Sequence, residues 1–365
     1  MAGATGETGR TGGTGGASRR RAAPVVAVRA VALRAMAVRA AAVLVMLAVV
    51  AVVTLGAAGC RAAGQGGGTA GTGGGGAGES GVAADTGAEF PLTVTDARGK
   101  ELAFDVAPRA IVSLAPSVTE ILFVIGAGPQ VVGIDDWSNY PPEAQGKARV
   151  GSYWPPTVEK VVALRPDLVV AAGEQLDWAG MLENLGLKVL VVDPQTVDEV
   201  EAAITLLGRV TGRAYDTARV VTDIRLRVSA VTSRVAAVPE SARPRVFYML
   251  YWDPLMTVGP NSLIGRLIEA AGGRNIAADA ASDYPEYSLE ALIARDPQVI
   301  VIAAGHDPGA PAAADLKGRP GFALLSAVRE GRVYAVDPDV MSRPGPRIAD
   351  ALEQLARLFY PELFQ

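Results

Sequence analysis

One stretch of this chain occurs twice, and the repetition limits the folds that the chain can adopt. Residues 159–173 read EKVVALRPDLVVAAG, and residues 290–305 read EALIARDPQVIVIAAG. Each copy opens with a glutamate, continues with apolar residues at helical spacing, and ends in a continuous apolar run typical of a buried strand. A helix–strand unit that recurs in this way predicts two halves with the same α/β architecture.

The residues around the first copy alternate between apolar strands and amphipathic helices. The expected strands are 109–116, 130–134, 167–173 and 188–193, and the expected helices are 117–128, 176–186 and 196–212. Continuous Val, Leu and Ile runs separated by helices predict parallel strands buried on both faces. Ser117 or Thr119 is expected to cap the first of these helices.

A long helix is expected over 214–238, because this stretch has no Gly or Pro and repeats apolar residues at helical spacing. The alternation then resumes, with strands at 245–250, 298–305 and 332–337 and helices at 262–273, 288–296 and 346–360. The fold class is therefore α/β, with two Rossmann-like lobes (90–213 and 239–365) joined by one long helix. Because a helix resists hinge bending, we expect only small movements of the lobes.

The N-terminal region has the pattern of a secretory leader. Six arginines between residues 19 and 39 precede an uncharged apolar run over 40–58, which ends in the sequence LGAAGC. The cysteine, Cys60, resembles the lipidated cysteine of a lipobox, so residues 1–59 are expected to be a signal peptide starting at Met1 or Met36. An uncleaved signal-anchor helix is the alternative. The glycine-rich residues 60–89 are expected to form a flexible tether.

Composition and motifs argue against several classes of function. The formal charge is −4, although residues 1–60 are strongly basic, so the remainder is acidic and a nucleic-acid partner is not expected. One cysteine and one histidine, His306, cannot form a Cys/His metal cluster. No G-x-S-x-G, Walker A or G-x-G-x-x-G motif follows a predicted strand. We therefore expect no catalytic residues, no metal site and no resident cofactor.

Aromatic residues are scarce, yet they gather in the predicted loops. They include Trp137, Tyr140, Tyr153, Trp154, Trp178, Tyr251, Trp252, Tyr284 and Tyr287. Loops after the carboxyl ends of parallel strands line the crevice in which α/β proteins bind ligands. Aromatic side chains there are suited to a large, partly apolar small molecule.

The combined motifs resemble a known family. The sequence RAIVSLAPSVTEILFVIGAGPQVVGIDDWSNYPPEA and the two repeated units are similar to substrate-binding proteins of ATP-driven importers for cobalamin, haem and ferric siderophores. The resemblance covers about residues 90–365, and it implies a ligand cleft between the two lobes. WSNYPPEA, YPEYSLEAL and SRPGPRI are similar to the cobalamin-binding branch.

The resemblance implies a set of site residues. Those implied to face a corrinoid ligand are Trp137, Asn139, Tyr140, Tyr153, Tyr284 and Arg343, and the loop residues Trp154, Trp252 and Asp253 are further candidates. Glu159 and Glu290 match the two glutamates with which this family docks on the permease, one from each lobe. Such charges at the rim of an interface contribute orientation and association rate.

The resulting hypothesis is a monomeric lipoprotein outside the cytoplasm, anchored to the outer face of the cell membrane, in the periplasm or at the cell surface. It would deliver cobalamin or a related corrinoid to an ABC transporter permease dimer with its ATPase subunits. A haem- or ferric-siderophore-binding protein of the same transporter class is the alternative. A surface enzyme or chelatase on a similar scaffold is a more distant one.

Overall fold

The computed structural model describes residues 89–152 and 155–364. The described residues belong to one compact unit, which contains every helix and strand given below and their hydrophobic core. The predicted leader, Cys60 and most of the predicted tether lie outside the described residues, as do Tyr153 and Trp154. No helix among the described residues is long and apolar enough to cross a membrane.

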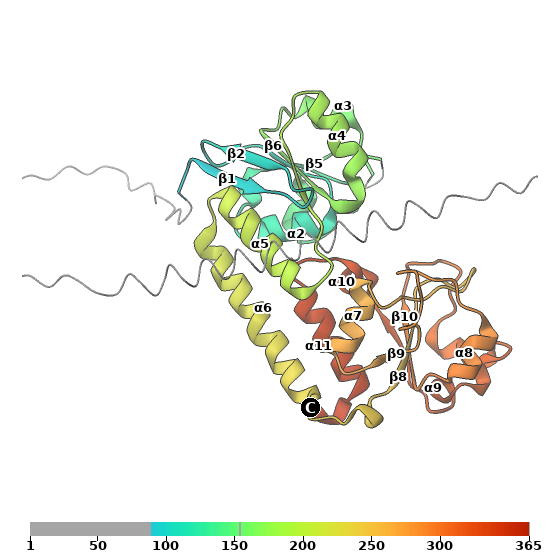
Figure 1. Cartoon of the computed structure of the whole chain (residues 1–365). Coiled ribbons are helices and arrows are strands. Elements are labelled where there is room, and N and C mark those ends of the chain that lie inside the picture. The colour runs from blue at the N-terminus through green and yellow to red at the C-terminus, as the bar shows by residue number, and fades with distance from the viewer. Residues whose placement is uncertain (1–88, 153–154, 365) are drawn as a thin grey trace, which may run out of the picture. The chain divides into compact units, whose positions relative to one another are not determined.

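The first lobe, at the top of Figure 1, contains a five-stranded parallel sheet. Its strand order is β5-β4-β3-β6-β7. Its strands are β3 (Ile111–Ser113), β4 (Val131–Ile134), β5 (Ala148–Arg149), β6 (Leu168–Ala172) and β7 (Val189–Val192). The helices are α2 (Pro116–Val124), α3 (Val158–Ala163), α4 (Leu176–Asn184) and α5 (Val197–Thr211). An antiparallel hairpin of β1 (Leu92–Thr95) and β2 (Glu101–Phe104) precedes the sheet.

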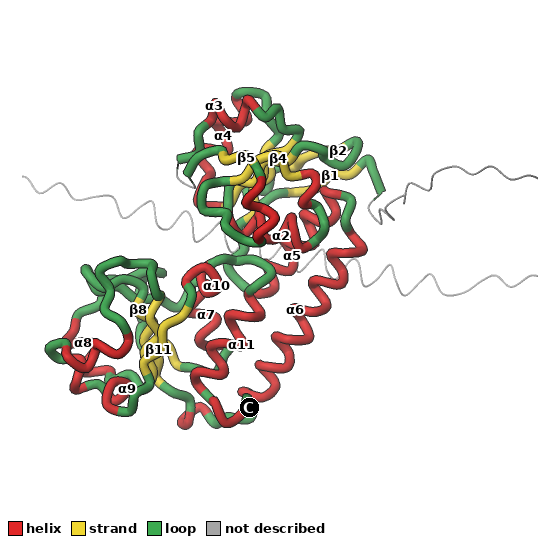
Figure 2. The backbone as a smooth tube through the Cα atoms, turned by 180° about the vertical axis from the view of Figure 1, so that it is seen from behind, coloured by secondary structure: helices red, strands yellow, loops and turns green. Residues whose placement is uncertain are grey.

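The second lobe contains a four-stranded parallel sheet with the order β11-β10-β8-β9. Its strands are β8 (Arg245–Met249), β9 (Arg274–Asn275), β10 (Val299–Ala303) and β11 (Val333–Val336). The helices are α7 (Leu263–Ala270), α8 (Leu289–Arg295), α9 (Ser326–Arg329), α10 (Pro338–Ser342) and α11 (Ile348–Phe359). Between the lobes runs α6 (Ala214–Val235), which packs against α5 of the first lobe and α11 of the second (Figure 2). The expected two-lobed α/β fold is therefore confirmed.

Each sheet is buried on both faces because alternate residues of its strands enter different apolar clusters. In β10, Val299 and Val301 join the large cluster that includes α2, α5, α6, α7 and α11, whereas Ile300 and Ile302 join a cluster with α8 and α9. In β3, Ile111 joins the large cluster and Val112 joins a third cluster with α3 and α4. Since successive strand residues point to opposite faces, this pattern explains the continuous apolar runs. The large cluster is shared by both lobes, so the lobes are packed together through their helices.

The sequence repeat corresponds to α3–β6 in the first lobe and α8–β10 in the second. The match extends to backbone conformation, because Arg165 and Asp296 occupy equivalent positions before a proline and have positive φ angles of 48° and 40°. They are the only non-glycine residues with positive φ in the described part of the chain. A left-handed residue after a helix stops it and directs the chain into the next strand. The two units therefore share a helix-ending turn as well as their order of elements.

Two details differ from the sequence-based expectations. The hairpin of β1 and β2 was not expected. In addition, neither Ser117 nor Thr119 caps α2, because the helix already begins at Pro116, with Ala115 at its N-cap and no side-chain cap. Proline fits the first turn of a helix because the amide hydrogen that it lacks has no partner there. Thr119 is buried, and its hydroxyl group bonds to two other hydroxyl groups instead.

Candidate functional site

The loop after β4 meets the segment after β11, and this meeting joins the two lobes. Asn139 Nδ2 donates to Asp339 Oδ2 at 2.8 Å, and Arg343 Nη1 donates to Asn139 Oδ1 at 2.8 Å. Arg343 Nη2 also donates to the backbone oxygen of Trp137 at 3.3 Å and lies 2.7 Å from Asp339 Oδ2. The carboxyl ends of a strand from each sheet thus lie together, as expected for a ligand site in parallel α/β lobes.

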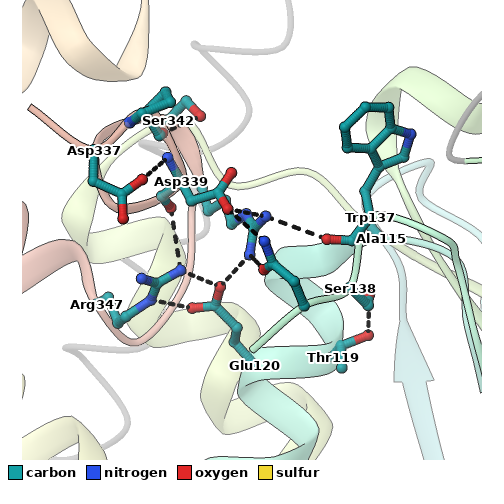
Figure 3. Close-up of polar contacts among 12 residues, drawn as sticks. Ala115, Thr119, Glu120, Trp137, Ser138, Asp337, Asp339, Ser342 and Arg347 are labelled. Atoms are coloured by element: carbon teal, nitrogen blue, oxygen red, sulfur yellow. Dashed lines mark hydrogen bonds and ion pairs between the residues drawn. The ribbon is translucent and has the colours of Figure 1, made fainter. Parts of the chain in front are cut away.

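A buried carboxylate lies beneath this loop. Glu120 on α2 is 1% exposed, and its Oε1 accepts hydrogen bonds from Arg343 Nη1 at 3.0 Å and Arg347 Nη2 at 2.6 Å. Arg347 Nε donates to Oε2 at 2.9 Å (Figure 3). We call Glu120, Asn139, Asp339, Arg343 and Arg347 the interlobe cluster. It places two carboxylates against two guanidinium groups, so its buried charges compensate one another.

A second polar group holds the loop from the side of the first lobe. The fully buried Asp135 accepts a hydrogen bond from the backbone nitrogen of Trp137 at 3.0 Å and another from Ser138 Oγ. Ser138 Oγ in turn lies 2.7 Å from Thr119 Oγ1. Burial raises the pKa of Asp135 to about 6, although hydrogen bonds from Ser138 and Trp137 and the charges of Arg343 and Arg149 act in the opposite direction.

The aromatic side chains of the loop remain accessible. Trp137 is 64% exposed, and its indole points away from the interlobe cluster (Figure 3). Tyr140 is also exposed, and the guanidinium carbon of Arg347 lies 4.5 Å from the centre of its ring, at the distance of a cation–π contact. Tyr140 lines a groove of about 780 Å³ with Phe123 and Arg347 and with residues of α6. The loop therefore has a fixed backbone and an exposed indole.

The remaining predicted ligand residues that the structure describes lie in the second lobe. Trp252 is half-buried against Phe322, with ring centres 5.3 Å apart, and Arg319 lies over its indole at 5.4 Å. Asp253 and Tyr284 are exposed. The segment of Tyr284 is held against the loop after β8, because the backbone nitrogen of Thr257 donates to the oxygen of Pro285 at 3.1 Å. Trp137, Asn139 and Arg343 thus come together, while Trp252, Asp253 and Tyr284 belong to a separate pair of neighbouring loops.

Glu159 and Glu290 occupy equivalent positions in the two lobes. Each is the second residue of its helix, α3 for Glu159 and α8 for Glu290, and each is exposed. Acidic residues are favoured in the first turn of any helix because of the helix dipole. Both carboxylates are therefore accessible to a partner protein, one from the equivalent position of each lobe.

Sequence reasoning did not identify Glu120, Asp339 and Arg347 as parts of the site. One signal was present, because Glu120 is the only charged residue of α2, whose sequence is PSVTEILFV. A glutamate in such surroundings is expected to be buried and paired. Its arginine partners are more than 220 positions away, and nothing local identifies them.

Within the described ranges, no group of three or more His, Cys, Asp or Glu side chains is arranged to hold a metal ion. The polar side chains of the interlobe cluster form hydrogen bonds and ion pairs with one another, and the accessible surface beside them is aromatic. Such a surface is suited to binding a molecule with a large flat face.

Comparison with known proteins agrees with this architecture. The family model of the periplasmic binding proteins matches residues 111–340. A cobalamin-binding protein of Halobacterium salinarum is 35% identical over 286 residues, which cover 76% of this chain and 76% of the relative. An uncharacterized ABC transporter substrate-binding lipoprotein of Bacillus subtilis, YvrC, is 31% identical over 282 residues, covering 76% of this chain and 88% of the relative.

A solved structure has the same fold. The periplasmic haem-binding protein BhuT, in complex with two haems, superposes with a TM-score of 0.64 at 28% identity, covering 71% of this chain and 100% of BhuT. The family match covers more than half of the chain, and both relatives exceed 30% identity over most of its length. The chain therefore belongs to the periplasmic binding protein family.

Proposed function

We propose that this protein captures cobalamin or a related corrinoid outside the cytoplasm and delivers it to the permease of an ABC importer. The observation that carries the proposal is the exposed indole of Trp137 on a loop whose backbone is fixed by both lobes. A rigid aromatic surface loses little entropy when a flat macrocycle stacks on it. The similarity to the cobalamin-binding protein of Halobacterium salinarum supports this choice of ligand.

Anchoring and delivery complete the proposal. Cys60 would carry the lipid, and the glycine-rich residues that follow would serve as a tether at the outer face of the membrane. Glu159 and Glu290 would each contact one half of the permease dimer, because they are exposed and occupy equivalent positions in the two lobes. The similarity to a substrate-binding lipoprotein of Bacillus subtilis supports the anchor and the transporter.

Haem or a ferric siderophore is the second candidate ligand, and one observation favours haem. Tyr251 and His306, in loops after β8 and β10, form an edge-to-face pair with ring centres 6.1 Å apart. A phenolate oxygen or an imidazole nitrogen can serve as an axial ligand of haem iron. The fold similarity to BhuT is compatible with this candidate.

Fluorescence titration of residues 80–365 distinguishes these ligands. This fragment contains the whole described core and all four Trp residues. Cyanocobalamin, haemin and a panel of ferric siderophores would be added separately, with Tyr251→Phe and His306→Ala as matched variants. The proposal predicts quenching by cyanocobalamin with a Kd of about 1 µM or tighter, unchanged in both variants. Binding of an iron compound alone, lost in either variant, would show that the corrinoid assignment is wrong.

A further inference from the structure

The interlobe cluster provides a second connection between lobes that the chain joins only once. The covalent connection is α6, which packs along α5 and α11. The cluster is a different contact, where the end of α10 reaches the loop after β4, although Glu120 and Arg347 line one groove with residues of α6. The shared apolar cluster already packs the lobes together through their helices, and the interlobe cluster adds a polar attachment at the loop after β4.

Glu120 is the centre of the cluster. The Glu120 carboxylate accepts three hydrogen bonds, all from Arg343 and Arg347 of the opposite lobe, and the side chain has almost no exposure to water. Arg343 is itself only 9% exposed. Loss of the carboxylate would therefore leave Arg343 with Asp339 as its ion-pair partner in the cluster, and Arg347 with only the backbone oxygen of Asp339. Breaking a buried charge pair by removing one partner is strongly unfavourable.

The same arginine connects Glu120 to the aromatic loop. Arg343 uses Nη1 for both Glu120 and Asn139, and Nη2 for the backbone oxygen of Trp137. Arg347 extends the connection to Tyr140, whose ring lies under its guanidinium group. A side chain that fixes both arginines therefore also fixes the backbone on which the exposed Trp137 is carried.

We propose that Glu120 is a positioning residue that clamps the two lobes together and sets the distance between the Trp137 loop and α10. It acts through Arg343 and Arg347 and does not need to touch the ligand. The effect on affinity rests on the proposed corrinoid function, whereas the effect on lobe separation does not.

Distance measurement between spin labels tests this clamp. The only cysteine of the sequence is Cys60, so residues 80–365 contain none. The substitutions Val162→Cys in the first lobe and Leu324→Cys in the second, both at exposed positions, therefore provide the two sites for spin labels. Electron–electron double resonance then gives the distance distribution without ligand. The variant is Glu120→Gln, which keeps the size of the side chain. The control is Glu183→Gln, which removes an ion pair with Arg98 at 2.8 Å within the first lobe.

We expect a broader and shifted distribution for Glu120→Gln, and a Kd for cyanocobalamin at least about tenfold weaker, while Glu183→Gln matches the unmodified fragment in both measurements. A distribution for Glu120→Gln that superposes on the unmodified one overturns the clamp. If circular dichroism shows that Glu120→Gln is unfolded, the same distance measurement is made on Arg347→Gln. This variant removes one partner of Glu120 and keeps its ion pair with Arg343. If the distances shift but the unmodified fragment binds no corrinoid, the clamp is supported and the proposed ligand is wrong.

Discussion

Asn139 and Asp339 are 200 positions apart in the sequence, yet Nδ2 of the asparagine donates to Oδ2 of the aspartate at 2.8 Å. One residue belongs to the loop after β4 and the other to α10, so this bond joins the two lobes. The loop is also held by Asp135 from within its own lobe. The backbone of Trp137, which lies on this loop, is therefore fixed before a ligand binds, and this reduces the entropy lost on binding.

Replacement of Trp137 with alanine is expected to weaken corrinoid binding about tenfold or more, because a stacking surface is lost. The free energy of unfolding should change by less than about 0.5 kcal/mol, since the indole is largely exposed. Calorimetric titration and urea denaturation measure the two quantities. Tyr215→Ala, at a similarly exposed aromatic on α6, is the control and should alter neither. An unchanged affinity in Trp137→Ala would remove Trp137 from the binding site.

Asp135 should make stability depend on pH in a defined window. Burial raises its pKa from 3.8 to about 6, so between these values the folded state holds a proton that the unfolded state has released. Relative to Asp135→Asn, the free energy of unfolding of the unmodified fragment should therefore fall as pH rises through this window, by about 3 kcal/mol, and stay constant above about pH 7.

The hydroxyl groups around Asp135 give this proton a structural role. Three hydroxyl protons, those of Ser113, Thr119 and Ser138, are available for four hydrogen-bonded contacts. Ser113 contacts the oxygen of Ala115 and the hydroxyl of Thr119, and Ser138 contacts the hydroxyl of Thr119 and the carboxyl group of Asp135. When Asp135 is protonated it donates to Ser138 Oγ, the reverse of the bond that its carboxylate accepts, and the hydroxyl proton of Ser138 is then free for Thr119. Urea denaturation of both proteins at a series of pH values measures the difference, and parallel stability curves would show that Asp135 does not titrate in this way.

Simultaneous replacement of Glu159 and Glu290 with alanine should abolish transport and leave ligand affinity unchanged. Each carboxylate is exposed and would orient one lobe on the permease. Uptake of labelled cobalamin by cells that produce the variant, with a titration of the purified fragment, provides the two readouts. Asp198→Ala is the matched control, since Asp198 is likewise an exposed acid at the second position of a helix, α5. Normal uptake by the double variant would exclude a docking role.

The contact between α5 and the connecting helix leaves no room for a side chain at Gly208. A Cβ atom there would lie 2.0 Å from Thr217 Oγ1 on α6, whereas a Cβ at Gly180 in α4 would meet nothing within 4 Å. Gly208→Ala is expected to destabilise the fold by about 1–3 kcal/mol. Gly180→Ala should stabilise it by about 0.4–1 kcal/mol because alanine restricts the unfolded chain. Thermal denaturation of both variants checks the pair, and equal changes would contradict this packing.

The parts of the fold that could be predicted from sequence are those with local periodic signals. The apolar runs of β6 and β10 and the uninterrupted helical spacing of α6 identify buried strands and a long helix without tertiary information. The hairpin of β1 and β2 was missed, although Leu92–Thr95 and Glu101–Phe104 alternate in burial around a short turn. Four-residue strands are too short for this alternation to be distinguished from the predicted glycine-rich tether that precedes them in the sequence.

The site was predictable only in part, for a different reason. The aromatic loop is contiguous in sequence, so its residues could be found together in WSNYPPEA. The interlobe cluster depends on side chains from α2, α10 and the segment before α11, which meet only after both lobes have folded. Trp252 looked similar to Trp137 in its loop, but it packs on Phe322 of its own lobe. Packing of this kind has no signature in the local sequence.

A competition experiment tests the central claim most directly. Residues 80–365 would be mixed with equimolar cyanocobalamin, haemin and a ferric siderophore, separated from free ligand by gel filtration, and examined by native mass spectrometry and absorption spectroscopy. The proposed function predicts one bound corrinoid per protein chain and its characteristic spectrum. Retention of haem or of the siderophore in place of the corrinoid would contradict it.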